Sequence, residues 1–179
     1  MISGGAIQPI QFQRAMVFID GTNLFYRLQA AKLRLNRPLP DIVTAYLGGR
    51  QIVRIYLYTI QQRFEEAQHI HGGHVAGGVR LVFGEGIPTP DGNIKEKGVD
   101  ALLVADLVYH AAVKNYDYAL LVSADTDFVQ ALHRVEDFGC RTGVLTICSA
   151  MPARLREVCD DAYSLSGDRL KSDGQAVPL

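Results

Sequence analysis

The sequence has 179 residues, of which 48% are hydrophobic and 21% are charged, and its formal net charge at pH 7 is −1. This length suits one α/β domain with a substantial core, and intrinsic disorder is not the default expectation for such a composition. The balanced charge argues against a protein that holds nucleic acid by bulk positive charge alone.

The three cysteines, Cys140, Cys148 and Cys159, lack the CxxC spacing of a zinc knuckle and lie in or beside apolar stretches. We therefore expect buried free thiols, which suit the reducing cytoplasm. The sequence has no secretory signal pattern and no run near the ~18 apolar residues that a membrane helix needs. These features predict a cytoplasmic protein with no membrane partner.

Hydrophobic patterns predict strands and helices in alternation. In chain order they predict a strand at 15–19, helices at 23–35 and 41–47, a strand at 52–58, a helix at 63–71, a short strand at 79–83, a loop at 84–98, a helix at 100–115, a strand at 118–123, a helix at 127–138, a strand at 141–147, a helix at 152–160 and an edge strand at 162–165. This order predicts an α/β fold with a central, mainly parallel sheet flanked by helices. We expect one domain over residues 13–166, between a flexible arm at 1–12 and a flexible tail at 167–179.

Four aspartates follow or open these predicted elements. Asp20 ends the first strand, Asp125 and Asp127 follow the strand at 118–123, and Asp100 opens the long helix. Ligands of parallel sheets bind outside the carboxyl ends of the strands, so we expect these carboxylates to share one edge. Asp106 lies about 120° around the helix from Asp100 and is left out of the candidate set.

Clustered carboxylates repel one another unless a cation compensates them. Mg²⁺ and Mn²⁺ prefer oxygen ligands, and either ion would provide that compensation. Each acid also has a structural alternative: Asp20 as a turn residue, and Asp100 or Asp127 as a helix cap. Asn23 either holds a carboxylate or phosphate in place or caps the first helix.

Three stretches carry a resemblance to a known family: residues 17–23 (VFIDGTN), 95–106 (KEKGVDALLVAD) and 123–128 (SADTDF). In order and spacing they resemble the NYN family of PIN-like domains over roughly residues 15–165. The resemblance is to the bacterial branch, formerly a domain of unknown function and related to a cyanobacterial circadian-output protein. One departure is Ala124, where a glycine is frequent in the family.

The resemblance implies a three-layer PIN-like (Rossmannoid) fold and an Mg²⁺- or Mn²⁺-dependent (endo)ribonuclease. It implies that Asp20, Asp100, Asp125 and Asp127 ligate or organise the metal, and that Asn23 fills the family's polar position after the first acid. The implied partner is RNA, and we expect it to be single-stranded. The oligomeric state is left open between a monomer and a homodimer.

Three cations are candidate substrate contacts: Lys95 and Lys97 just before Asp100, and Arg27 on the first helix. The alternative for each is a solvated surface charge. The alternative function is a non-catalytic domain of the same fold that binds RNA or protein. A haloacid dehalogenase-type phosphatase is disfavoured because Thr22 stands where its second acid is needed, and a dinucleotide-binding protein because GxGxxG is missing after the first strand.

Overall fold

The computed structural model describes residues 13–65, 67 and 79–179 of the chain. Within them, the strands of the central sheet are β1 (Arg14–Asp20), β3 (Gln51–Ile60), β4 (Val79–Pro88), β5 (Ile94–Lys97), β6 (Tyr118–Val122), β7 (Arg141–Ile147) and β8 (Asp161–Leu165). They lie in the order β5-β4-β3-β1-β6-β7-β8. Every neighbouring pair is parallel except β4 and β5 at one edge. The mainly parallel sheet expected from the sequence is therefore confirmed.

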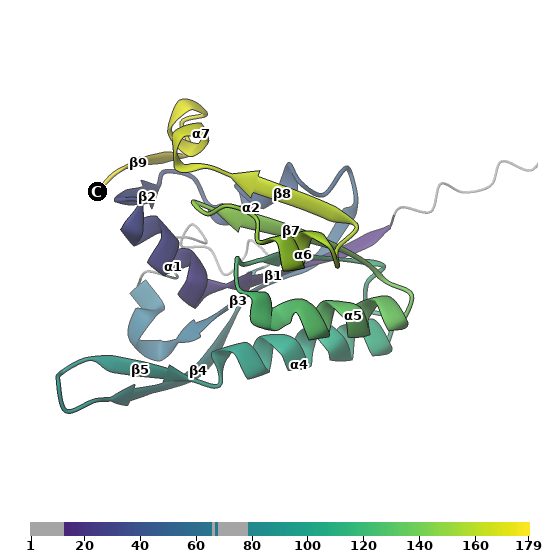
Figure 1. Cartoon of the computed structure of the whole chain (residues 1–179), viewed down its shortest axis with the longest axis horizontal. Helices are drawn as coiled ribbons and strands as arrows, with labels where there is room; N and C mark the ends of the chain where they lie inside the picture. The colour runs from purple at the N-terminus through teal and green to yellow at the C-terminus, as the bar shows by residue number, and fades with distance from the viewer. Residues whose placement is uncertain (1–12, 66, 68–78) are drawn as a thin grey trace, which may run out of the picture.

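Helices cover both faces of the sheet and complete three layers (Figure 1). One face packs against α1 (Gly21–Ala30), α2 (Leu39–Thr44) and α7 (Gly167–Ser172). The other face packs against α4 (Val99–Ala112), α5 (Val129–Asp137) and α6 (Ala153–Arg156). Two short 3-10 turns, η1 (Gln61–Arg63) and η3 (Thr126–Phe128), lie at strand ends. The layered α/β fold agrees with the sequence-based prediction.

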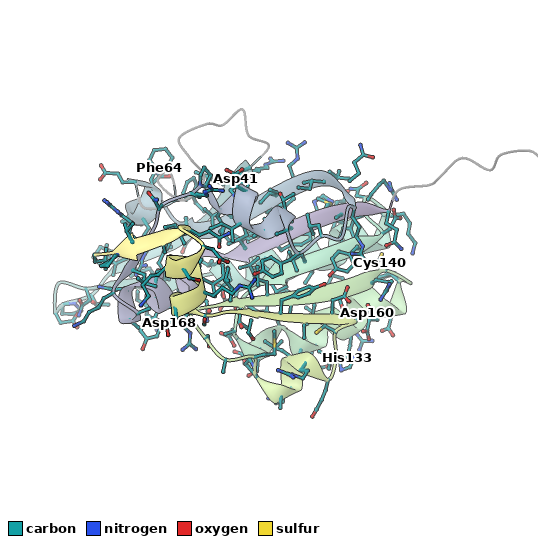
Figure 2. All side chains as sticks on the ribbon, turned by 90° about the horizontal axis from the view of Figure 1, so that it is seen from above. Asp41, Phe64, His133, Cys140, Asp160 and Asp168 are labelled. Atoms are coloured by element: carbon teal, nitrogen blue, oxygen red, sulfur yellow. The ribbon has the colours of Figure 1, made fainter. Side chains whose placement is uncertain are left out.

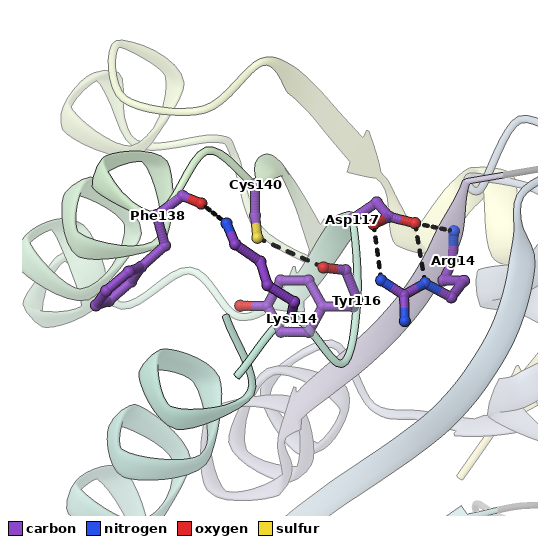
Figure 3. Close-up of polar contacts among 6 residues, drawn as sticks. All are labelled: Arg14, Lys114, Tyr116, Asp117, Phe138 and Cys140. Atoms are coloured by element: carbon purple, nitrogen blue, oxygen red, sulfur yellow. Dashed lines mark hydrogen bonds and ion pairs between the residues drawn. The ribbon is translucent and has the colours of Figure 1, made fainter. Parts of the chain in front are cut away.

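Strand β1 is the centre of the molecule, between β3 and β6. Successive side chains of a strand point to opposite faces. Val17 and Ile19 accordingly belong to the core under α1, whereas Met16 and Phe18 belong to the core under α4. At the end where the strands begin, the Arg14 guanidinium binds the carboxylate of Asp117 just before β6 (Figure 3). Cys140 and Asp160, which precede β7 and β8, lie at this same end (Figure 2).

The predicted helix at 23–35 is wrong in its second half. Helix α1 ends at Ala30, and Lys32 has a φ of 54°, which turns the chain out of the helix. The next residues form β2 (Leu33–Leu35), which pairs antiparallel with β9 (Ala176–Pro178). The expected flexible tail at 167–179 instead contains α7 and β9. Its Leu170 is fully buried, so this segment is held by packing as well as by the strand pair.

The predicted loop at 84–98 is an antiparallel hairpin. Strand β4 continues to Pro88, the chain turns at residues 89–93, and β5 returns beside it, with Glu85 opposite Lys97. Gly92 has a φ of 80°, and the Asp91 side chain accepts hydrogen bonds from its turn neighbours. The hairpin projects from the body of the molecule (Figure 1). Its glycines and prolines belong to strands and a tight turn rather than to an irregular loop.

Other elements differ from prediction mainly in length. The helix expected at 41–47 spans Leu39–Thr44, the one at 152–160 is only Ala153–Arg156, and the one at 127–138 starts as η3 before α5. For the helix expected at 63–71, residues 61–63 form a 3-10 turn and the described residues 64, 65 and 67 are helical, as expected. Residues 66 and 68–71 lie outside the described part, as does the arm at 1–12. Among the helices described, none is both long enough and apolar enough to cross a membrane.

Candidate active site

Asp20 lies at the carboxyl end of the central strand and is only 2% exposed. It caps α1, because its Oδ1 accepts a hydrogen bond of 3.0 Å from the backbone N–H of Asn23. Its Oδ2 accepts one of 2.8 Å from the Ser123 hydroxyl, which follows β6. Burial first, and then the negative charges of Asp100 and Asp125, raise the pKa of Asp20 to about 6 despite these two bonds. A carboxyl group held in this state is poised to accept a cation.

The loop after β6 is built around Asp20 by a chain of hydrogen bonds. The Ser123 Oγ accepts from the backbone N–H of Asp125 at 3.0 Å, and the Asp125 carboxylate accepts from the backbone N–H of Asp127 at 2.9 Å. Asp125 therefore caps η3, the role that the sequence alternative gave to Asp127. The Asn23 Oδ1 accepts from the backbone N–H of Ala124 at 3.2 Å and joins α1 to this loop. Asn23 thus ties two segments together and is not the cap of its helix.

Asp100 is brought to the same edge by the hairpin and α4. It lies one residue inside the helix, whose cap is Gly98 with a φ of 80°, so Asp100 is not the N-cap. Its pKa is raised by partial burial first, and then by the negative charges of Asp125, Asp127 and Glu96. Asp20 interacts with the charges of Asp100 and Asp125, and Asp100 with those of Asp125 and Asp127. The four aspartates singled out from the sequence therefore lie near one another.

Glu96 is an acid at this site that the sequence reasoning missed. It lies on β5, half-buried, and its carboxylate accepts a hydrogen bond from the Thr22 hydroxyl at the start of α1. Its other oxygen lies 3.1 Å from Nε of Arg63. Side chains alternate between the two faces of a strand, so a strand at residues 94–97 would have put Glu96 on the face opposite Lys95 and Lys97. The sequence reasoning missed this because it treated these residues as a loop.

The three cations proposed from the sequence are not in the acid cluster. Lys95 and Lys97 are exposed, and strand alternation turns them to the face of the hairpin opposite Glu96. Arg27 lies farther along α1, with its guanidinium 5.8 Å from the Tyr26 ring centre. The structure thus places these three residues around the site rather than within it.

Asp106, left out of the candidate set, has a structural partner. Its Oδ2 accepts a hydrogen bond of 2.9 Å from the hydroxyl of Tyr58, whose side chain is fully buried on β3. This bond fixes α4 on the sheet about 1.7 turns beyond Asp100. Asp106 therefore helps to hold the helix that carries a site residue.

The donor chemistry of the cluster fits a hard divalent cation. Among the described residues, no ion pair involves Asp20, Asp100, Asp125 or Asp127, so none of these four carboxylates is paired with a protein cation there. In the same part of the chain, no three His, Cys, Asp or Glu side chains are arranged to hold an ion by themselves. Mg²⁺ often keeps several waters and takes only one or two carboxylates directly. The cluster fits that mode rather than a cage made wholly of protein.

Comparison with known proteins agrees with this architecture. A protein of unknown function from Vibrio parahaemolyticus is similar in structure, with a TM-score of 0.70 and 20% sequence identity over 90% of this chain and 98% of its own. At this identity the likeness concerns the fold alone. Comparison with curated proteins gives no match. The NYN domain family matches residues 14–166, which include all of the acids described above. The chain therefore belongs to the NYN domain family, within the PIN-like nuclease superfamily.

Proposed function

We propose that this chain is a divalent-metal-dependent ribonuclease that hydrolyses RNA phosphodiester bonds at the cluster around Asp20. The observation that carries the proposal is the buried Asp20 carboxyl group, whose pKa is raised to about 6 beside Asp100 and Asp125 at one edge of the sheet. A fold stabilised by packing alone gains nothing from such an arrangement. A site that takes up a divalent cation needs it. Membership in a nuclease family supports the same function.

Each acid has a distinct position in this proposal. Asp20, Asp100 and Asp125 would hold Mg²⁺ or Mn²⁺, in part through waters of the ion, which when bound would activate water and offset negative charge on the phosphoryl oxygens. Asp127 adjoins them on η3 and would orient water at the edge of the cluster. Ser123 and the Asn23 backbone hold the Asp20 carboxylate in one orientation. Hydrolysis by water predicts products with 5′-phosphate and 3′-hydroxyl ends.

A route through the RNA 2′-hydroxyl would need a general base such as histidine and would leave cyclic phosphates. The described histidines lie elsewhere. His110 is engaged by the Tyr56 hydroxyl at 3.0 Å and the Asn115 amide at 2.8 Å, and His133 lies on α5 (Figure 2). His69, His71 and His74 lie outside the described residues. The described part of the chain therefore favours hydrolysis by water.

The test is cleavage of end-labelled single-stranded RNA with Mg²⁺ or Mn²⁺, with and without EDTA. Asp20→Asn and Asp125→Asn should abolish cleavage while the proteins stay folded. Asp168→Asn is the matched control, because Asp168 is a 94% exposed acid on α7 whose carboxylate pairs with Lys171 and which is none of the clustered acids (Figure 2). Cleavage that persists in EDTA, or in both site variants, would reject the mechanism. If the folded wild type binds RNA or a protein partner but cuts no RNA, the non-catalytic alternative replaces it.

A further inference from the structure

Arg63 is a cation that the fold brings to the acid cluster. It lies on η1, directly after β3, at the edge of the sheet where Asp20 ends β1. Its Nε lies 3.1 Å from the Glu96 carboxylate, and its guanidinium carbon lies 5.6 Å from the ring centre of Phe25 on α1. Among the ion pairs of the described residues, this is the one formed with an acid of the cluster.

Three elements meet at this guanidinium. Glu96 comes from β5 and Phe25 from α1, while Arg63 itself comes from η1. The Thr22 hydroxyl binds the second oxygen of Glu96, so the carboxylate that faces Arg63 is also fixed. The hairpin is held against η1 a second time, because Gln62 Nε2 donates to the Gly86 carbonyl at 3.2 Å. A cation held from several sides loses little conformational freedom when it binds an anion.

The chemistry of the proposed substrate favours a side-chain cation here, in addition to the metal ion. A phosphodiester that approaches five carboxylates is repelled unless positive charge is nearby. A planar guanidinium matches phosphate oxygens better than an ammonium does, because it can donate two parallel hydrogen bonds. Arg63 remains accessible for this contact, since 32% of its side chain is exposed.

We infer that Arg63 is the residue that binds a phosphate of single-stranded RNA beside the carboxylate cluster, and that Glu96 positions its guanidinium. The inference rests on the proposed ribonuclease function and names the contact that brings the substrate backbone to the acids. It assigns this role to a residue between β3 and the hairpin, rather than to the two exposed lysines of β5.

The test measures binding of a fluorescent single-stranded RNA oligonucleotide in EDTA, where cleavage does not contribute. Arg63→Gln should weaken binding by about tenfold, and the slope of log affinity against log salt should fall by about 0.7, the value for one phosphate contact on a single strand. Arg63→Lys keeps the charge and should keep the slope while losing part of the affinity. Circular dichroism and thermal unfolding check that each variant is folded.

Arg134→Gln is the matched control. Arg134 also pairs with a carboxylate, that of Asp137 at 2.7 Å, but it lies on α5 and is 67% exposed. Its loss should change neither affinity nor slope. If the wild type cuts RNA and Arg63→Gln binds as Arg134→Gln does, the role of Arg63 is refuted while the proposed function stands. If the wild type neither binds nor cuts RNA, both are refuted.

Discussion

Replacing Asp20 by asparagine should make the metal-free protein more stable at neutral pH. The raised pKa means that the folded protein disfavours the charged carboxylate relative to the unfolded chain. A rise from the ordinary value of 3.8 to about 6 corresponds to roughly 3 kcal/mol. Asparagine removes this charge and keeps an oxygen for the Asn23 N–H. It loses the acceptor for the Ser123 hydroxyl, which costs about 1 kcal/mol, so a net gain of roughly 2 kcal/mol is expected.

The pH dependence has a definite direction. Between pH 3.8 and about 6 the folded state holds the Asp20 proton and the unfolded state has released it, so the free energy of unfolding falls as pH rises. Above pH 6 both states are deprotonated, and the loss is complete. The advantage of Asp20→Asn should therefore be full at pH 7.5 and should vanish near pH 4, where the native Asp20 is already neutral.

The measurement is urea unfolding in EDTA at these two pH values. Asp117→Asn is the control with the opposite sign, because the Arg14 guanidinium beside Asp117 lowers the pKa of that carboxyl (Figure 3). This variant should be less stable than the wild type at pH 7.5. The reasoning is refuted if Asp20→Asn is less stable than the wild type in EDTA at pH 7.5. It is also refuted if the difference in stability between the variant and the wild type is the same at both pH values.

Divalent metal should reverse the order of stability. An ion that binds only the folded protein stabilises it by about 2.7 kcal/mol at a hundred times its Kd. Mg²⁺ or Mn²⁺ should therefore raise the unfolding midpoint of the wild type at pH 7.5 and leave that of Asp20→Asn nearly unchanged. If the metal raises the unfolding midpoint of both proteins equally, the raised pKa of Asp20 has no connection with metal binding, and Asp20 is not part of the metal site.

Three further substitutions examine the support of the site and its surroundings. Tyr58→Phe removes the hydroxyl that binds Asp106 at 2.9 Å, and it should lower the free energy of unfolding by about 1–2 kcal/mol without changing the metal requirement of cleavage. Leu103→Ala, at a fully buried position of α4, should cost about 2–5 kcal/mol in urea unfolding. The double change Lys95→Glu with Lys97→Glu should alter RNA affinity and its salt dependence less than Arg63→Gln does, because both lysines face away from Glu96, and a salt titration measures this; a larger loss than that of Arg63→Gln would return the substrate contact to the lysines.

Sequence patterns predicted the helices and strands that are determined by their own local run of apolar residues. Strand β7 was expected at its observed bounds, and β1 and α4 within a residue or three, because continuous apolar runs between polar breaks leave little choice of structure. Partners distant in sequence decided the rest. Residues 33–35 fit a helical pattern, but pairing with residues 176–178 makes them a strand. No local pattern contains that information.

The same limit explains what was found and missed at the site. Asp20, Asp100, Asp125 and Asp127 were recognisable because they follow or open predictable elements, and sheet topology brings such ends together. Glu96 was not, because its position depends on the hairpin at 84–98, whose glycines and prolines are typical of a loop. Without the hairpin, the side chains of a KEK triplet have no assigned faces, and the lysines are the natural candidates for a phosphate. The pairing of β5 with β4 makes this segment a strand, whose alternation puts Glu96 on one face and the two lysines on the other.

The pKa shifts of Asp20 and Asp100 have the opposite direction to the one that capping alone predicts. Asp20 caps α1 and Asp100 lies in the first turn of α4, where the helix dipole stabilises a negative charge by roughly 0.3–1 kcal/mol. An acid that served only as a cap would therefore have a lowered pKa. The pKa values of both acids are raised instead, and the rise for Asp20 corresponds to roughly 3 kcal/mol. Burial and mutual repulsion therefore outweigh the stabilisation of the negative charge by the helix dipoles. The acids weaken the metal-free fold, and a cation that binds among them would remove that cost.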